Sequence, residues 1–137
     1  MNTNLTLGAA FVLAGAMGAW GIHGLQAQQE KPPFTRTMLQ AHDLSTPGRA
    51  VVVARVDFQP GAEIGRHTHP GEEVGYVLEG TLTLEVEGKP PVTLKAGDVF
   101  FVEAGRAHGG KNGNMPGKVL ATYVVEKGKP LATAVRK

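Results

Sequence analysis

The stretch Gly65–Gly80, GRHTHPGEEVGYVLEG, decides the fold and begins with two histidines one residue apart. Successive side chains of a β-strand point to opposite faces, so His67 and His69 lie on the same face, roughly 6.6 Å apart along the strand. The Pro-Gly pair that follows breaks the strand, and Glu73 begins the next one. We therefore expect two imidazoles and a carboxylate close enough together to converge on one metal ion.

From Glu73 onward, the same alternation divides the next strand into two faces. Gly75 and Val77 point with Glu73, and a glycine there leaves open space beside the carboxylate, which suits a ligand pocket. An apolar stripe points the other way: Val74, Tyr76 and Leu78. This stripe needs cover, either from the chain segment before the domain or from a second subunit, because a large exposed apolar patch is unusual on a monomer.

Short strand-like segments recur on both sides of this stretch, over residues 50–127. They are rich in Val, Leu, Thr or aromatic residues, each is bounded by Gly or Pro, and none shows a helical period: AVVVARVDF, EVGYVLEG, TLTLEVEG, VTLKAGDVFFVEAG and KVLATYVVEKG. Turns are expected at Glu87 to Lys89 and at Ala96 to Asp98. Regularly spaced short strands of this kind predict an all-β antiparallel sandwich or barrel.

The composition sets limits on the kind of protein. A chain of 137 residues, with 42% hydrophobic and 19% charged residues, is expected to form one packed domain. Its net charge of +2 comes from scattered side chains with no clustered basic face, so nucleic-acid binding is not expected. The chain has no cysteine, which excludes disulfides and thiolate sites. Any metal must then be held by histidine, carboxylate or water.

The first residues have the character of an export leader. No charged side chain precedes Glu30, and the apolar run from Leu7 to Ile22 is rich in Ala and Gly. We expect a signal peptide that is cleaved after Ala27, and a periplasmic or secreted domain. The alternative is an uncleaved membrane anchor, since Leu5 to Ile22 comes close to the length of a spanning helix. The predicted organisation is a leader at 1–27, an N-terminal arm at 28–50, a barrel at 51–127 and a C-terminal tail at 128–137.

Two motifs in this chain resemble those of the cupin superfamily. The first motif is matched at every defined position: Gly61, His67, His69, Glu73 and Gly80. The second lies in GDVFFVEAGRAHGGKN and is matched at Gly97, Gly105, His108 and Asn112. Glu103 stands where the family has proline, a departure that concerns a turn. The resemblance implies a double-stranded β-helix, which is a small jelly-roll barrel.

The resemblance also implies a metal site. Its ligands would be His67, His69, Glu73 and His108. Such a set suits Fe, Mn, Ni, Cu, Co or Zn as a divalent ion and leaves coordination positions open. Alternation turns Glu72 away from the histidines. Tyr76 is a candidate general acid because some cupin lyases use tyrosine, although alternation points it away from the metal as well.

The resemblance leaves two classes of function open, because cupins include many enzymes and also proteins without turnover. The first is a metal-dependent enzyme of dioxygenase, lyase or isomerase type that acts on a small oxygenated or aromatic compound. The alternative is a non-catalytic cupin that binds a small molecule or the metal itself. Small cupins commonly pair, so we expect a homodimer, with membrane contact only through an uncleaved leader. Three aromatic residues are expected in the core or the pocket lining: Phe100, Phe101 and Tyr123.

Overall fold

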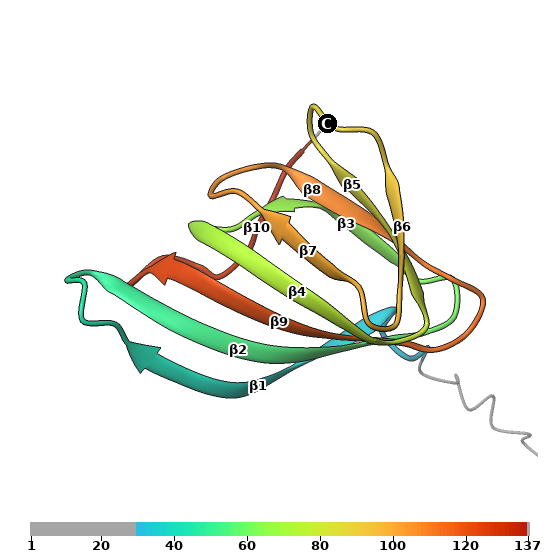
Figure 1. Ribbon diagram of the computed structural model, residues 1–137, viewed down its shortest axis with the longest axis horizontal. Helices are drawn as coiled ribbons and strands as arrows, with labels where there is room; N and C mark the ends of the chain where they lie inside the picture. The colour runs from blue at the N-terminus through green and yellow to red at the C-terminus, as the bar shows by residue number, and fades with distance from the viewer. Residues whose placement is uncertain (1–29, 137) are drawn as a thin grey trace, which may run out of the picture.

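The computed structural model describes residues 30–136, which form ten β-strands and no helix (Figure 1). The all-β class predicted from the sequence is therefore confirmed. No helix in this part of the chain could span a membrane. The predictions of a cleaved leader at 1–27 and of an uncleaved anchor fall on residues outside the described part.

The strands form two five-stranded antiparallel sheets that face each other as in a jelly-roll barrel (Figure 1). The first sheet has the order β1 (Phe34–Asp43), β2 (Arg49–Phe58), β9 (Gly117–Glu126), β4 (Gly71–Glu79), β7 (Val99–Val102). The second has the order β10 (Thr133–Ala134), β3 (Glu63–Thr68), β8 (His108–Asn112), β5 (Thr81–Val86), β6 (Val92–Lys95). Strands distant in sequence, such as β4 and β9, thus become neighbours.

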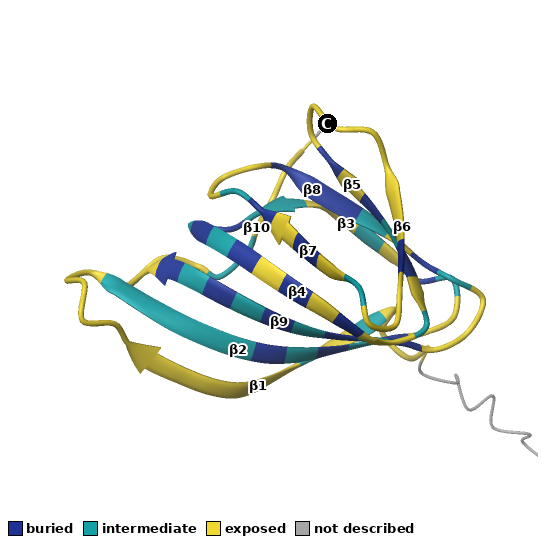
Figure 2. Ribbon diagram, viewed as in Figure 1, coloured by how far each residue is buried: buried dark blue, intermediate teal, exposed yellow. Residues whose placement is uncertain are grey.

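Burial alternates along β4, β5, β7 and β9 as the sequence predicts, with the core between the sheets (Figure 2). On β4, Glu73, Gly75 and Val77 are buried, and the three residues of the apolar stripe are exposed. The stripe pairs with outward residues of β7, Val74 with Phe101 and Tyr76 with Val99. We call the resulting exposed apolar surface the outer patch: Val74, Tyr76, Leu78, Val99 and Phe101.

The expectation of open space beside Glu73 is wrong. Gly75 lies opposite Phe100 on the neighbouring strand β7. A Cβ atom at Gly75 would meet the Phe100 ring at 2.0 Å. The glycine therefore makes room for an aromatic side chain of the next strand, and that ring fills the volume assigned to a ligand.

Both segments that flank the predicted barrel contribute strands to it. The arm at 28–50 contains β1, which pairs along β2 with Phe34 opposite Phe58. The tail at 128–137 contains β10, which pairs with β3 and places Ala134 opposite His67. Because β2 and β9 separate β1 from β4, the arm does not cover the outer patch of its own chain.

The predicted turns are confirmed at two glycines with left-handed backbone angles. Gly88 has φ of 78° and Gly97 has φ of 97°, conformations that residues with a Cβ rarely adopt. The turn that carries Glu103 is exposed, and its carboxylate accepts a hydrogen bond from Lys89 Nζ at 2.7 Å. The departure from the family's proline thus lies on a turn that contacts the histidine cluster through its backbone, because Gly105 N–H donates to the carbonyl of His69 at 3.0 Å.

Candidate metal centre

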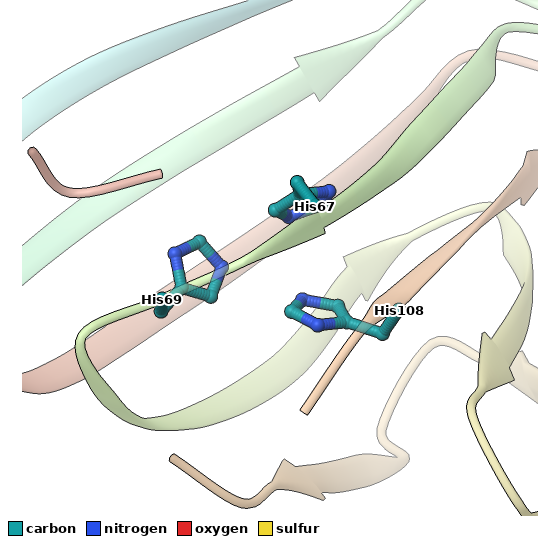
Figure 3. Close-up of side chains that lie close together, drawn as sticks. All are labelled: His67, His69 and His108. Carbon is teal, nitrogen blue, oxygen red and sulfur yellow. The ribbon is translucent and has the colours of Figure 1, made fainter. Parts of the chain in front are cut away.

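Three histidines from β3, β8 and the turn after β3 converge inside the barrel (Figure 3). His67 and His108 are direct cross-strand partners, and His69 follows the end of β3. Their ligand nitrogens lie within 4.8 Å of one another. His69 and His108 are buried and His67 is partly buried. The structure thus brings together all three histidines singled out by the motifs.

A β-bulge on β3 aims His67 into the barrel. Ile64 pairs with Gly110 and His67 with His108, so β3 advances three residues while β8 advances two. Regular alternation would turn Ile64 and His67 to opposite faces, yet both line the same cavity. The extra residue in the bulge removes this conflict, a known use of bulges beside functional sites.

Each of the three imidazole rings is held by a hydrogen bond from its Nδ1 atom to a backbone carbonyl. The acceptors are Gly65 for His67 (2.8 Å), Leu131 for His69 (2.5 Å) and Arg106 for His108 (2.9 Å). A neutral imidazole that donates through Nδ1 has its lone pair on Nε2. All three rings are therefore oriented as metal-binding histidines are, with the second ring nitrogen fixed by a backbone acceptor.

Glu73 adds a buried carboxylate to the cluster. Its Oε2 atom lies 3.0 Å from Nε2 of His108 and 3.2 Å from Nε2 of His69. Burial by itself raises the pKa of Glu73, but the contacts with His108 and His69 outweigh it and lower that pKa to about 2. Burial lowers the pKa of His67 to about 4. At neutral pH Glu73 is ionised and His67 is neutral, which are the forms that bind cations.

The pKa of His108 shifts the other way. Burial alone would lower it, but the hydrogen bonds to Glu73 and to the Arg106 carbonyl raise it above the ordinary value. The Glu73 carboxylate thus favours a positive charge beside it. A cation at this place would meet the same electrostatic attraction.

The residues of the cluster fit a transition metal. Nε2 of His69 is buried and has no hydrogen-bond partner within the described residues, although Glu73 lies nearby. A buried polar atom without a partner is uncommon, and a bound ion is one of the explanations for it. Three imidazole nitrogens and one carboxylate oxygen form a donor set that suits divalent ions of the first transition row.

Tyr123 is an aromatic neighbour of the cluster that the sequence placed only in the core or the pocket lining. It lies on β9 directly opposite Glu73, and its ring centroid is 4.7 Å from that of His69. Burial and the negative charge of Glu73 raise the pKa of Tyr123 far above its ordinary value. Its hydroxyl therefore stays protonated and can act as a hydrogen-bond donor.

The remaining predicted residues lie away from the cluster. Tyr76 belongs to the outer patch and is 44% exposed, so the structure does not bring it to the histidines. Glu72 pairs with Val124 on the face of β4 opposite to Glu73. Phe101 is also exposed on the outer patch, whereas Phe100 is buried and lines the cavity.

A cavity of about 50 Å³ adjoins the cluster between the two sheets. Its walls are mainly apolar and come from Phe34, Val56, Phe58, Leu84, Phe100 and Val119. The polar side chains of the lining are His67, Glu73, His108, Tyr123 and Arg36. Arg36 is a residue of β1 that the sequence did not single out. The only signal for Arg36 was its alternation with Phe34 in a segment taken for an arm.

The comparisons with known proteins agree with this fold. Residues 54–123 match the cupin domain family, and the chain belongs to the cupin superfamily. An oxalate-binding protein of Thermotoga maritima is 38% identical over 79 residues, which cover 56% of this chain and 64% of that protein. The chain thus spans less than two thirds of the length of that relative.

Further similarity extends beyond the cupin motifs. Oryzines biosynthesis cluster protein J of Aspergillus oryzae is 33% identical over 134 residues, 91% of this chain and 68% of that protein. Among solved structures, a cupin of Shewanella frigidimarina matches with a TM-score of 0.57 and 26% identity over 72% of this chain and 81% of that one. The fold implied by the motifs is therefore confirmed.

Proposed function

We propose that this protein holds one divalent transition metal and uses it to bind a small oxygenated compound. The ligands would be His67, His69, Glu73 and His108. The observation that carries the proposal is the fixed orientation of the three imidazoles, whose Nδ1 atoms are all bonded to backbone carbonyls. The donor set accepts Fe, Mn, Ni, Cu, Co or Zn.

When bound, a metal at this place would supply a Lewis acid that polarises an oxygen atom of the ligand. The chain itself would bind and orient that ligand. Apolar walls from both sheets limit the water that can surround it. The protonated hydroxyl of Tyr123 offers a hydrogen-bond donor beside Glu73 and His69. These features favour a metal-dependent enzyme of dioxygenase-like or lyase-like type.

Capture of a small molecule without turnover is the second candidate. Apart from the four proposed ligands, the ionisable groups that line the cavity within the described residues are Tyr123 and Arg36. The raised pKa of Tyr123 makes its hydroxyl a poor general base, and an arginine does not lose its proton in proteins. The similarity to a protein named for oxalate binding is in keeping with this candidate.

The first experiment measures the metal content of the protein purified from its own compartment without added metal. A His67→Ala/His108→Ala double variant is compared with His42→Ala, a control that removes an exposed histidine of β1 bonded only to Gln40. We expect near-stoichiometric metal in the wild type and in His42→Ala, and none in the double variant. Absence of metal from all three proteins would overturn the proposal.

A second experiment separates the two candidates. The metal-loaded protein is incubated with diols, flavonols and hydroxy acids, and both products and recovered ligand are quantified. Metal-dependent conversion of a compound supports an enzyme. Tight metal-dependent binding of a compound that is recovered unchanged supports capture.

We also propose that the folded domain is exported. The proposal rests on the uncharged, apolar character of residues 1–29, which lie outside the described part of the chain. The mass of the mature protein from its native host tests it. A mass that corresponds to a chain starting at residue 28 supports cleavage after Ala27. A full-length, membrane-associated protein supports the anchor.

A second copy of the chain is the proposed cover of the outer patch. The sequence left two candidates for this cover, the N-terminal arm and a second subunit. The arm lies at the other edge of the sheet, so the second subunit remains. A two-fold axis would bring the same apolar patch of both copies together. We expect Phe101→Lys to shift a dimer to a monomer in sedimentation velocity, and Val92→Lys, at an exposed position of β6, to leave it unchanged. A wild type that is monomeric at all concentrations contradicts the proposal.

A further inference from the structure

Arg36 is a cationic side chain in the cavity that the metal proposal does not use. We infer that Arg36 binds a carboxylate group of the ligand, so that the substrate class is small carboxylates with a second oxygen donor, such as hydroxy acids and dicarboxylates. One oxygen donor would reach the metal and the carboxylate would meet the guanidinium. The inference rests on the proposed metal-dependent function and names the ligand class of the same site.

The register of β1 directs Arg36 into the barrel. Arg36 pairs with Val56 of β2, and cross-strand partners in an antiparallel pair point to the same face of the sheet. Val56 is only 5% exposed and belongs to the core, so Arg36 points inward as well. Phe34 does the same opposite the buried Phe58. Arg36 and Phe34 accordingly both line the cavity that adjoins the histidines.

The guanidinium group of Arg36 is close to the site and has no anionic partner among residues 30–136. Its Cζ atom lies 5.8 Å from the centroid of the Tyr123 ring, and that ring packs against His69. Its Nε atom is buried without a hydrogen-bond partner within residues 30–136. No ion pair among these residues involves Arg36, whereas Arg55 on β2 pairs with Asp57 at 2.8 Å.

The charges of the site favour an anion. Three neutral imidazoles and the Glu73 carboxylate leave a divalent ion with a net charge of about +1, and Arg36 adds another positive charge. Two uncompensated charges beside apolar walls are costly, and a ligand anion removes that cost. A guanidinium presents its N–H groups as a planar fork that matches the two oxygens of a carboxylate.

The size of the cavity limits the ligand. A cavity of about 50 Å³ lined by aromatic and aliphatic side chains has room for a compound of few carbon atoms. The Cζ atom of Arg36 and the ring of His69 both lie near the Tyr123 ring, at 5.8 Å and 4.7 Å from its centroid, so the cation and one of the proposed metal ligands share a neighbour at the cavity. A short molecule with oxygen atoms at both ends suits this arrangement better than a long or aromatic one.

Titration calorimetry on the metal-loaded full chain tests the inference with two probes of nearly equal size. Glycolate is the smallest hydroxy acid, and glycolamide is its neutral amide. We expect Arg36→Gln to weaken glycolate binding about 10–100-fold, the range of one charge-assisted contact, and to leave glycolamide binding unchanged. Arg55→Gln, which removes a partly exposed arginine of the neighbouring strand, is the matched control and should bind both probes as the wild type does.

Several results would overturn the inference. Unchanged glycolate affinity in Arg36→Gln, or equal losses for both probes, would show that Arg36 does not recognise the carboxylate. Tighter binding of inorganic phosphate than of glycolate would contradict the ligand class. Arg36→Lys, which keeps the charge, covers the case in which Arg36→Gln does not fold. We expect it to retain the preference for glycolate over glycolamide, and loss of that preference would count against the inference.

Metal content is measured before each titration, so the two proposals fail separately. A wild type without metal overturns the proposed function, and the ligand class with it. A fully loaded wild type whose glycolate binding does not depend on Arg36 overturns the ligand class alone. Loss of metal in Arg36→Gln would assign Arg36 a structural role, which also contradicts the inference.

Discussion

The carbonyl of Leu131 links the C-terminal segment to the metal centre, and truncation tests that link. His69 is 3% exposed, and its Nδ1 donates a hydrogen bond to this carbonyl. The two residues are 62 positions apart in the chain. A chain that ends after Pro130 loses the acceptor. The buried N–H would then lack a partner, at a cost of about 1–3 kcal/mol, or the ring would rotate to find one. In either case Nε2 of His69 is no longer fixed.

We expect this truncation to weaken metal affinity about 10–100-fold, which is the usual effect of removing a partner that orients a ligand. That range corresponds to about 1.4–2.7 kcal/mol and agrees with the cost of the lost hydrogen bond. Competition with a chromogenic chelator measures the affinity, and circular dichroism of the metal-free protein checks the fold.

A second truncation, after Ala132, provides the control. It removes β10, at Thr133–Ala134, but keeps the Leu131 carbonyl, and should lose less affinity. Wild-type affinity in the chain that ends after Pro130 would refute the reasoning. Equal losses in both truncations would assign the effect to pairing of β10 with β3, and would refute the role of Leu131 as well.

Three further substitutions test the assignment of neighbouring residues. Tyr76→Phe should leave metal content unchanged, and the free energy of unfolding within about 0.5 kcal/mol, because Tyr76 lies on the outer face; lost metal or activity would contradict this. Gly75→Ala should lower the free energy of unfolding in urea by about 1–3 kcal/mol, because its Cβ would overlap the Phe100 ring; an unchanged midpoint would contradict the packing. Asn112→Ala should lower it by about 2 kcal/mol, because the buried amide donates to two loop carbonyls at 2.9 and 2.8 Å; a loss below about 0.5 kcal/mol, the usual size for a surface substitution, would contradict that role.

The faces of the strands could be predicted because strand geometry has a period of two. His67 and His69 stand one residue apart and therefore both reach the cluster, and the same rule separated Glu73 from Tyr76. The rule holds wherever pairing is regular. It does not locate the bulge between Ile64 and His67, since the extra residue becomes visible only when β3 is aligned with β8.

Contacts between distant segments could not be predicted from local pattern. Phe100 fills the space at Gly75 because β7 pairs with β4, and Tyr123 reaches His69 because β9 is the other neighbour of β4. Neither pairing follows from the residues of one strand. A glycine in a strand leaves space where a side chain would otherwise lie. Only the sheet order shows that an aromatic ring, rather than a ligand, occupies this space.

Two residues near the ends of the described chain reach the site from outside the family match. The family match covers residues 54–123, which contain all four proposed metal ligands. Arg36 and the Leu131 carbonyl come from strands and segments on either side of that range, and each reaches the site through pairing with the barrel. The motif can therefore determine the atoms that bind the metal without determining which small molecule binds beside it. If Arg36 selects carboxylates and Leu131 orients His69, cupins with the same motif and different flanking segments should bind the same metals and differ in ligand.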